Sequence, residues 1–302
     1  MTGEFDSAAL GVSKAYKVYL PDGYESTDRR YPVLYLLHGL GVGEEAWTSA
    51  TLDVAGTADR LDFPALIVMP DGDRGYYVNG RTPPNYERCF ANTMPKKNRS
   101  EPRASFCVRH ANYETYIVRD LIGYVDSRFR TVPKRRARAI AGESGGGYGA
   151  MMLAFRHPDL FGSVAAHSGF FSLLYLGPHP YRRGKVRLRE SIAPGRTDPE
   201  QLSIFGTEFS NWLAHDPVSL AERLQDDVPA IYFDVGTEDP NGFADQARYF
   251  HDRLTALGIA HHFEAVPGGH NETLWKERIA HSLCFHKEAF RRAGLTGDET
   301  GR

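Results

Sequence analysis

Cysteine is scarce in this chain, with three residues in 302: Cys89, Cys107 and Cys284. Three thiols are too few for a disulfide framework, and they lack the paired short spacing of a zinc site, so we expect no metal. Cys89 and Cys107 lie in one polar segment. A disulfide between them is one alternative if the protein is exported. The low count favours the other interpretation, three unrelated thiols.

Long apolar runs and an excess of one charge are also missing. No stretch approaches the about 18 apolar residues of a membrane-spanning helix, so we expect no membrane span. Thirty-six Lys and Arg stand against 38 Asp and Glu, a formal charge of −2. This balance argues against nucleic acid or an anionic membrane as the main partner. The basic runs at 96–99, 134–138 and 181–185 are accordingly predicted to be solvated loops.

The first residues, MTGEFDSAALGV, contain neither the basic nor the long apolar region of a signal peptide. We therefore expect a cytoplasmic protein, or a secreted one if a signal peptide has been removed. A length of 302 residues is common for α/β enzymes built as one unit, and we expect a single domain over residues 1–302. The oligomeric state has no signature in the sequence.

Short apolar runs with turn residues at their ends recur along the chain and predict buried strands. They occupy residues 14–21, 32–39, 65–72, 137–143, 163–169, 230–236 and 261–269. Helical spacing lies between them, most clearly over 113–129 and 243–258. This alternation predicts a mostly parallel sheet with helices on both faces and an antiparallel first strand near one edge. Two stretches, 81–112 and 172–215, break the pattern, and we expect irregular insertions there that act as lid or substrate loops.

A glycine-rich turn surrounds one serine in AIAGESGGGYGAMM, residues 139–152. Gly142, Ser144 and Gly146 form the GxSxG pattern of a nucleophile elbow, a sharp turn between a strand and a helix. The required context is present, because a predicted strand precedes the serine and a helical pattern follows it. Such a turn places the hydroxyl at the carboxyl end of the sheet and aims the N–H of Gly145 at a substrate oxyanion.

A serine hydroxyl needs a base to become a nucleophile, and the base needs a carboxylate to orient it. In the α/β-hydrolase fold the acid and then the histidine follow the serine along the chain. His270 lies in a predicted loop after the last strand and is the candidate base. Asp239 lies in the loop after the preceding strand and is the candidate acid. Asp234, within that strand, is expected to be structural, and Glu238 is expected to be solvated.

A second oxyanion donor is expected from the loop after an earlier strand, in LLHGLGVGEEAW. His38 and Gly39 end that strand, so the N–H of Leu40 is the candidate donor. A main-chain donor needs no particular side chain, and the assignment depends on position alone. His38 is expected to pack or to form hydrogen bonds.

These segments resemble the esterase D family of α/β hydrolases, which includes carboxylesterases, feruloyl esterases, S-formylglutathione hydrolases and mycolyltransferases. The matching segments are YPVLYLLHGLGVGEEAW, VMPDGDRGYYVN, YETYIVRDLIGYVDSRF, GESGGGYGAMMLAFRHPDLFGSVAAHSG, FDVGTED and GGH, which span most of residues 14–290. The resemblance implies the α/β-hydrolase fold and supports the triad and the two oxyanion donors named above. It implies no cofactor.

The resemblance also implies that four residues of PDGDRGYYVN lie near the substrate cleft: Asp71, Gly72, Tyr77 and Asn79. A structural role for this loop is the alternative. Glu143 and Gly145 stand where many members of the family have Leu or His and Met. For Gly145 the hypothesis is extra room near the nucleophile.

The predicted function is hydrolysis of a small-molecule carboxylic ester through an acyl-enzyme on Ser144. Short-chain esters are one candidate class, and aromatic residues in segments expected to border the site suit an aryl or hydroxycinnamoyl ester. These residues are Tyr76, Tyr77, Phe170, Phe171, Tyr175, Phe205 and Trp212. A thioesterase acting on S-formylglutathione and an acyltransferase stay open as alternatives. A catalytically inactive binding protein on the same fold would be expected to lack a triad member, and all three are present.

Overall fold

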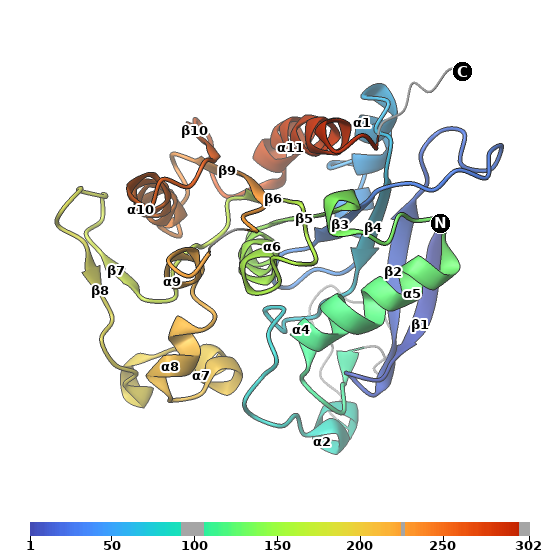
Figure 1. Cartoon of the computed structure of the whole chain (residues 1–302). Helices are drawn as coiled ribbons and strands as arrows, with labels where there is room; N and C mark the ends of the chain where they lie inside the picture. Colours follow the sequence, from blue (N-terminus) through green and yellow to red (C-terminus); the bar gives the residue numbers. More distant parts are fainter. Residues whose placement is uncertain (92–105, 225–226, 296–302) are drawn as a thin grey trace.

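The computed structural model describes residues 1–91, 106–224 and 227–295, and a mixed sheet lies at its centre (Figure 1). The strand order is β1-β2-β4-β3-β5-β6-β9-β10. The strands are β1 (Thr2–Ser7), β2 (Val12–Tyr19), β3 (Val33–Leu37), β4 (Leu66–Pro70), β5 (Arg138–Glu143), β6 (Ser163–His167), β9 (Ala230–Gly236) and β10 (His262–Val266). β2 pairs antiparallel with β1 and β4, and the other neighbours run parallel. The predicted sheet is confirmed, and β1 is an edge strand that the apolar pattern did not indicate.

The central strands are buried on both faces, as their continuous apolar runs predict. Every residue of β3, β4, β5 and β6 is buried. In β3 the side chains of Leu34 and Leu36 join the core beneath α1 and α11, whereas Tyr35 and Leu37 join the larger core on the other face. This two-residue alternation gives the sheet two apolar faces, each of which needs a layer of helices.

Helices cover both faces of the sheet (Figure 1). One face carries α1 (Val54–Arg60) and α11 (Glu272–Arg292), whose buried residues share a core with alternate strand residues. The other face carries α4 (Tyr113–Thr115), α5 (Ile122–Arg128), α6 (Gly145–Arg156), α9 (Pro217–Ala221) and α10 (Phe243–Ala256). A π-helical turn, η2 (Tyr116–Leu121), joins α4 to α5, so the predicted helix over 113–129 is continuous. Short 3-10 turns are η1 (Ala46–Thr48), η3 (Arg135–Ala137) and η4 (Pro194–Arg196).

The insertion at 172–215 has more regular structure than expected. It contains the strand pair β7 (Tyr175–Gly177) and β8 (Arg187–Leu188), and the helices α7 (Pro199–Phe205) and α8 (Phe209–Leu213). Asp252 of α10 accepts hydrogen bonds from Tyr181 and Arg183, and the guanidinium of Arg74 pairs with Glu200 at 2.7 Å. Polar contacts therefore hold this insertion against two other parts of the fold.

The insertion at 81–112 contains α2 (Tyr86–Ala91) and a disulfide between Cys89 and Cys107. The interpretation of three unrelated thiols is therefore wrong for this pair, whose members the fold brings together across 18 positions of sequence. Cys284 is free and exposed. Sequence alone could not decide the pairing, because it depends on where the fold places α2 relative to Cys107.

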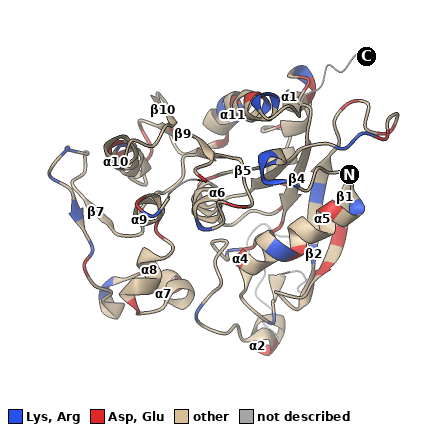
Figure 2. Ribbon diagram, viewed as in Figure 1, with Lys and Arg blue, Asp and Glu red and all other residues tan. Residues whose placement is uncertain are grey.

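Charged residues of both signs are spread over the helices and loops (Figure 2). The basic run at 181–185 is largely exposed, as predicted, and the run at 96–99 lies outside the described residues. The run at 134–138 is only partly solvated, because Arg138 begins β5 and its buried guanidinium pairs with Asp126 at 2.6 Å. Within the described ranges, none of the helices combines the length and the apolar character needed to span a membrane.

Candidate active site

Ser144 lies in a sharp turn between β5 and α6, as the GxSxG pattern predicts. Its backbone adopts φ 52° and ψ −118°, a strained conformation for a residue that has a side chain. The turn closes because its neighbours are glycines. A β-carbon at Gly142 would lie 2.5 Å from main-chain atoms of Gly146, and one at Gly146 would lie 2.5 Å from the carbonyl oxygen of Leu37. The glycines therefore let β5, α6 and the end of β3 meet around the serine.

Ser144, His270 and Asp239 form one continuous chain of hydrogen bonds. Nε2 of His270 lies 2.9 Å from Oγ of Ser144, and Nδ1 of His270 lies 2.8 Å from Oδ2 of Asp239. A carboxylate can only accept, so Nδ1 carries the proton and Nε2 is free to accept one from the serine. The Asp239 side chain is fully buried and also accepts from the N–H of Asn241, whereas the His270 side chain is 16% exposed. The arrangement is a buried carboxylate, an oriented imidazole and a partly exposed hydroxyl.

Two aromatic rings, which the sequence did not single out, hold the imidazole of His270 from its sides. The ring of Phe243 meets it edge-on at 5.3 Å between centroids, and Trp275 meets it edge-on at 5.1 Å. Both rings are partly exposed. Since the base lies in a loop, these contacts restrict the rotation that a loop histidine would otherwise have.

The loop that follows β3 brings the N–H of Leu40 next to the elbow. Gly145 is the first residue of α6, so its N–H has no acceptor within the helix. A β-carbon at Gly145 would lie 3.3 Å from the nitrogen of Leu40 and 2.6 Å from its Cγ. The two predicted oxyanion donors are thus adjacent. The hypothesis that Gly145 enlarges the substrate site is wrong, because the side chain of Leu40 occupies that space.

A comparison with protein families places this geometry among known enzymes. The model of the Esterase family, described as "Putative esterase", matches residues 7–286. The chain belongs to this esterase family. It has the α/β-hydrolase fold, as the resemblance to esterase D implies.

The chain is similar to several known proteins. Esterase Rv1288 and Esterase MT1326 of Mycobacterium tuberculosis are each 30% identical to it over 283 residues, which cover 88% of this chain and 54% of theirs. The chain thus spans about half the length of these curated relatives. Among solved structures, a ferulic acid esterase superimposes with a TM-score of 0.70 at 24% identity, covering 96% and 97% of the two chains. An S-formylglutathione hydrolase from Agrobacterium tumefaciens gives 0.70 at 19% identity, covering 95% and 94%. At these identities the superpositions establish the fold.

Asp71 and Tyr77, two of the predicted substrate contacts, both contact His38 in the loop that follows β3. They are 0% and 2% exposed, so solvent does not reach them. Asp71 pairs with buried Lys14 at 2.8 Å, and the Tyr77 hydroxyl donates to the carbonyl of His38 at 2.8 Å. Burial raises the pKa of Tyr77 well above its usual range, which keeps this donor protonated. The substrate contact predicted for both is wrong, and the structural alternative holds.

Asn79 and Gly72 also serve the scaffold. The amide of Asn79 donates to the hydroxyl of Thr115 at 2.9 Å and accepts from the N–H of Thr115 at 3.1 Å, which ties the loop to α4. The N–H of Gly72 donates to Nε2 of His38 at 2.8 Å. His38 therefore carries its proton on Nδ1, which donates to the carbonyl of Gly39 at 2.8 Å. The hydrogen-bonding role expected of His38 is confirmed.

Glu143 is the functional candidate that the sequence left without a role. It is 3% exposed, directly precedes the serine, and accepts a hydrogen bond from the N–H of Gly39. Burial raises the pKa of its carboxyl group. The available signal was a charged residue at the end of an apolar strand, where a charge is costly unless it has a partner.

The aromatic residues expected to border the site are mostly core. All seven are at most 8% exposed: Tyr76, Tyr77, Phe170, Phe171, Tyr175, Phe205 and Trp212. Phe170 stacks on Tyr148 at 4.4 Å and contacts Phe243 at 5.6 Å. Phe243, which also contacts His270, therefore connects Phe170 with the imidazole.

A second serine, histidine and aspartate form a similar chain in the core. Oγ of Ser282 lies 2.9 Å from Nε2 of His167, whose Nδ1 lies 2.9 Å from Oδ2 of Asp234. All three side chains are completely buried, and Arg278 also donates to Asp234. Although burial acts to raise it, His167 and Arg278 hold the pKa of Asp234 below its usual range. The structural role expected of Asp234 is confirmed.

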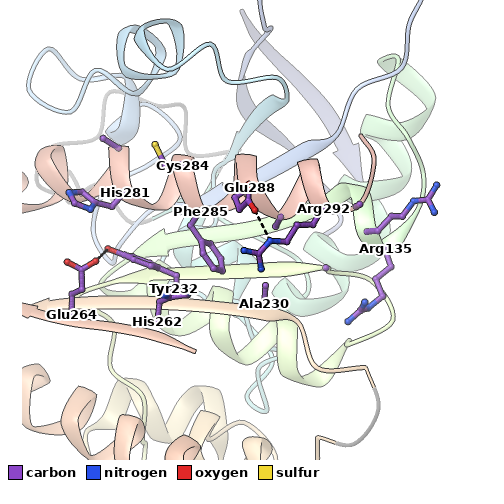
Figure 3. Close-up of a pocket in the computed structure, with 15 residues that line it drawn as sticks. Arg135, Ala230, Tyr232, His262, Glu264, His281, Cys284, Phe285, Glu288 and Arg292 are labelled. Carbon is purple, nitrogen blue, oxygen red and sulfur yellow. Dashed lines mark hydrogen bonds and ion pairs between the residues drawn. The ribbon is translucent and has the colours of Figure 1, made fainter. Parts of the chain in front are cut away.

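A cavity of about 790 Å³ lies between α11 and the sheet, away from Ser144 (Figure 3). Ala230 and His262, which line it, are the first residues of β9 and β10, so the cavity is at the amino ends of the strands. The rings of Tyr232 and Phe285 lie between the helix and the sheet. Reacting groups of α/β enzymes lie at the opposite, carboxyl ends of the strands. We therefore place the candidate active site at Ser144 and not in this cavity.

Proposed function

We propose that the esterase hydrolyses carboxylic esters through an acyl-enzyme formed on Ser144. The observation that carries the proposal is the hydrogen-bond chain from Asp239 through His270 to a serine held at positive φ. The family supports hydrolysis of esters as a class, and this geometry supports the roles of the individual residues.

The first half of the reaction transfers the acyl group to the enzyme. Oγ of Ser144 attacks the carbonyl carbon while its proton passes to Nε2 of His270, and Asp239 stabilises the imidazolium that forms. The N–H groups of Leu40 and Gly145 bind the oxyanion, each contributing roughly 3 kcal/mol. When the tetrahedral intermediate collapses, the ester C–O bond breaks and His270 gives its proton to the departing alcohol.

The second half returns the free enzyme. A water molecule attacks the acyl carbon, His270 takes one of its protons, and the same two N–H groups bind the second oxyanion. Collapse breaks the bond to Ser144, which recovers its proton from His270, and the carboxylic acid leaves. Only an acyl group and protons move, so these steps call for no redox cofactor.

For the substrate, we propose a short-chain or an aryl, feruloyl-type ester. The partly exposed rings of Phe243 and Trp275 beside His270 provide apolar surface for the acyl or the alcohol part. One solved neighbour is a ferulic acid esterase and another an S-formylglutathione hydrolase, which supports testing an aryl ester and a thioester side by side.

The test is a set of initial rates on p-nitrophenyl acetate, butyrate and octanoate, methyl ferulate and S-formylglutathione. Ser144→Ala is the inactive variant, and Ser282→Ala is the matched control, because it removes the same hydroxyl from the buried chain. We expect ester cleavage that Ser144→Ala abolishes and Ser282→Ala retains. Preference for methyl ferulate would assign an aryl pocket, and preference for the thioester would replace the ester proposal. Wild-type rates in Ser144→Ala would refute the mechanism.

A further inference from the structure

We infer that Glu143 is a positioning residue of the oxyanion loop, which comprises residues 38–40. Its carboxylate accepts a hydrogen bond from the N–H of Gly39 and so fixes the peptide group that precedes the one carrying the Leu40 N–H. The inference rests on the proposed function, because the orientation of that N–H matters only if it binds an oxyanion.

The carboxyl group of Glu143 and the backbone of Gly39 form one packed unit. Glu143 is the last residue of β5 and is 3% exposed. Burying a carboxyl group is costly unless its oxygens find donors, and Oε1 finds the N–H of Gly39. A β-carbon at Gly39 would lie 2.5 Å from both carboxylate oxygens. Only glycine therefore fits against the glutamate at this distance.

Two successive peptide groups of the oxyanion loop are clamped. In the peptide between His38 and Gly39, the N–H donates to Glu143 and the carbonyl accepts from the Tyr77 hydroxyl. In the peptide between Gly39 and Leu40, the carbonyl accepts from Nδ1 of His38. A peptide group is planar and trans, so a fixed carbonyl sets the direction of the N–H on its other side. The Leu40 N–H is thereby aimed by contacts on the protein side of the loop.

The hydrogen bond to Glu143 also ties this loop to the nucleophile. The pairing of β3 with β5 ends at Leu37 and Gly142, so strand pairing does not hold the residues that follow. Glu143 is the next residue of β5 and is bonded directly to Ser144. Its side chain therefore continues the link between the two strands as far as Gly39, one residue before the proposed donor.

The positioning role requires a hydrogen-bond acceptor in the side chain at position 143, which glutamate provides. Many members of the esterase D family carry Leu or His at this place, and Leu fills a similar volume but accepts no hydrogen bond. In this protein, Leu would leave the buried N–H of Gly39 without its acceptor, and no other acceptor for it is present in the described part of the chain. Gln keeps an acceptor oxygen at nearly the same position.

The experiment compares Glu143→Gln and Glu143→Leu with the wild type on p-nitrophenyl acetate. We expect Glu143→Gln to keep kcat within about threefold, and Glu143→Leu to lower kcat about 10- to 100-fold, short of the full loss of one oxyanion donor. KM should change less than about threefold, because the loop acts on the transition state. Affinity for a trifluoromethyl ketone, which forms an oxyanion on the serine, should fall by about the same factor as kcat.

Circular dichroism and the unfolding midpoint establish that each variant is folded, and Glu143→Ala repeats the comparison if the Leu variant is unstable. Equal kcat values for Glu143→Leu and the wild type would overturn the inference and leave the proposed function intact. Equal damage in Glu143→Gln and Glu143→Leu would also overturn it, because the amide oxygen still accepts. Wild-type activity in Ser144→Ala would instead remove the proposed function on which the inference rests.

Discussion

At the scale of single residues, two Ser–His–Asp chains with closely similar distances have different surroundings. The Ser144 chain has a strained serine and a histidine that solvent reaches, whereas the Ser282 chain is wholly buried and its serine lies in regular helix α11. Hydrogen-bond geometry alone does not separate a nucleophile from a core network. Backbone strain at the serine and solvent access to the histidine distinguish the two chains.

This difference predicts that replacing each serine with alanine has opposite effects on stability and on activity. Ser282→Ala should lower the free energy of unfolding by roughly 1–3 kcal/mol, because it leaves the buried Nε2 of His167 without its hydrogen-bond partner, while kcat/KM stays within about twofold. Ser144→Ala should abolish turnover and leave the unfolding midpoint near or above that of the wild type, since it removes no core contact. Urea unfolding and ester assays on both variants test this, and loss of activity in a folded Ser282→Ala would contradict the assignment.

Gly145 offers a second test at this scale. A methyl group there would press on Leu40, so Gly145→Ala should displace an oxyanion donor and reduce kcat/KM at least about 10-fold. Gly123 is the matched control, because a β-carbon at that helical position meets nothing within 4 Å. Gly123→Ala should leave the rate unchanged and stabilise α5 by up to about 1 kcal/mol. Equal rates for the two variants would contradict a role of the Leu40 N–H as an oxyanion donor.

At the scale of elements, α11 is attached to the sheet by buried polar groups as well as by apolar packing. His286 of α11 is fully buried, and its Nδ1 lies 2.8 Å from Oγ of Ser163 at the start of β6. Ile279 and Leu283 of the same helix pack in the core beneath the sheet. The helix that follows His270 is therefore held by apolar packing and by a buried hydrogen bond to β6.

His286 predicts the direction in which stability depends on pH. Burial lowers its pKa to about 3, from 6.5 in the unfolded chain. Between these values the unfolded chain binds the extra proton, so the free energy of unfolding falls as pH drops below 6.5 and recovers as pH rises. The loss should reach roughly 2 kcal/mol by pH 5. Urea midpoints of the wild type and His286→Gln across pH 5 to 8 test this, and parallel curves would contradict it.

At the scale of the whole molecule, the sequence predicted what depends on local pattern and chain order. Continuous apolar runs located the parallel strands, and GxSxG with the later loop positions located Ser144, Asp239 and His270, which the fold brings together. The edge strand β1 was missed because an edge strand carries half-exposed, mixed residues.

Contacts between distant segments could not be predicted in the same way. The resemblance to the esterase D family implied that the loop residues Asp71 and Tyr77 lie near the substrate cleft. Their burial depends on Lys14 and His38, whose partners are set by how β2, β3 and β4 pack. The disulfide of Cys89 and the clamp of Glu143 depend on such long-range packing as well.

In the proposed mechanism, Ser144 carries the acyl group. The most direct test is rapid acid quench of the enzyme with p-nitrophenyl acetate, followed by mass spectrometry of the peptides. We expect one acetyl group on Ser144 in the wild type and in Ser282→Ala, and none in Ser144→Ala. An acetyl group on another residue that turns over at the rate of hydrolysis, or undiminished hydrolysis in Ser144→Ala, would contradict this mechanism.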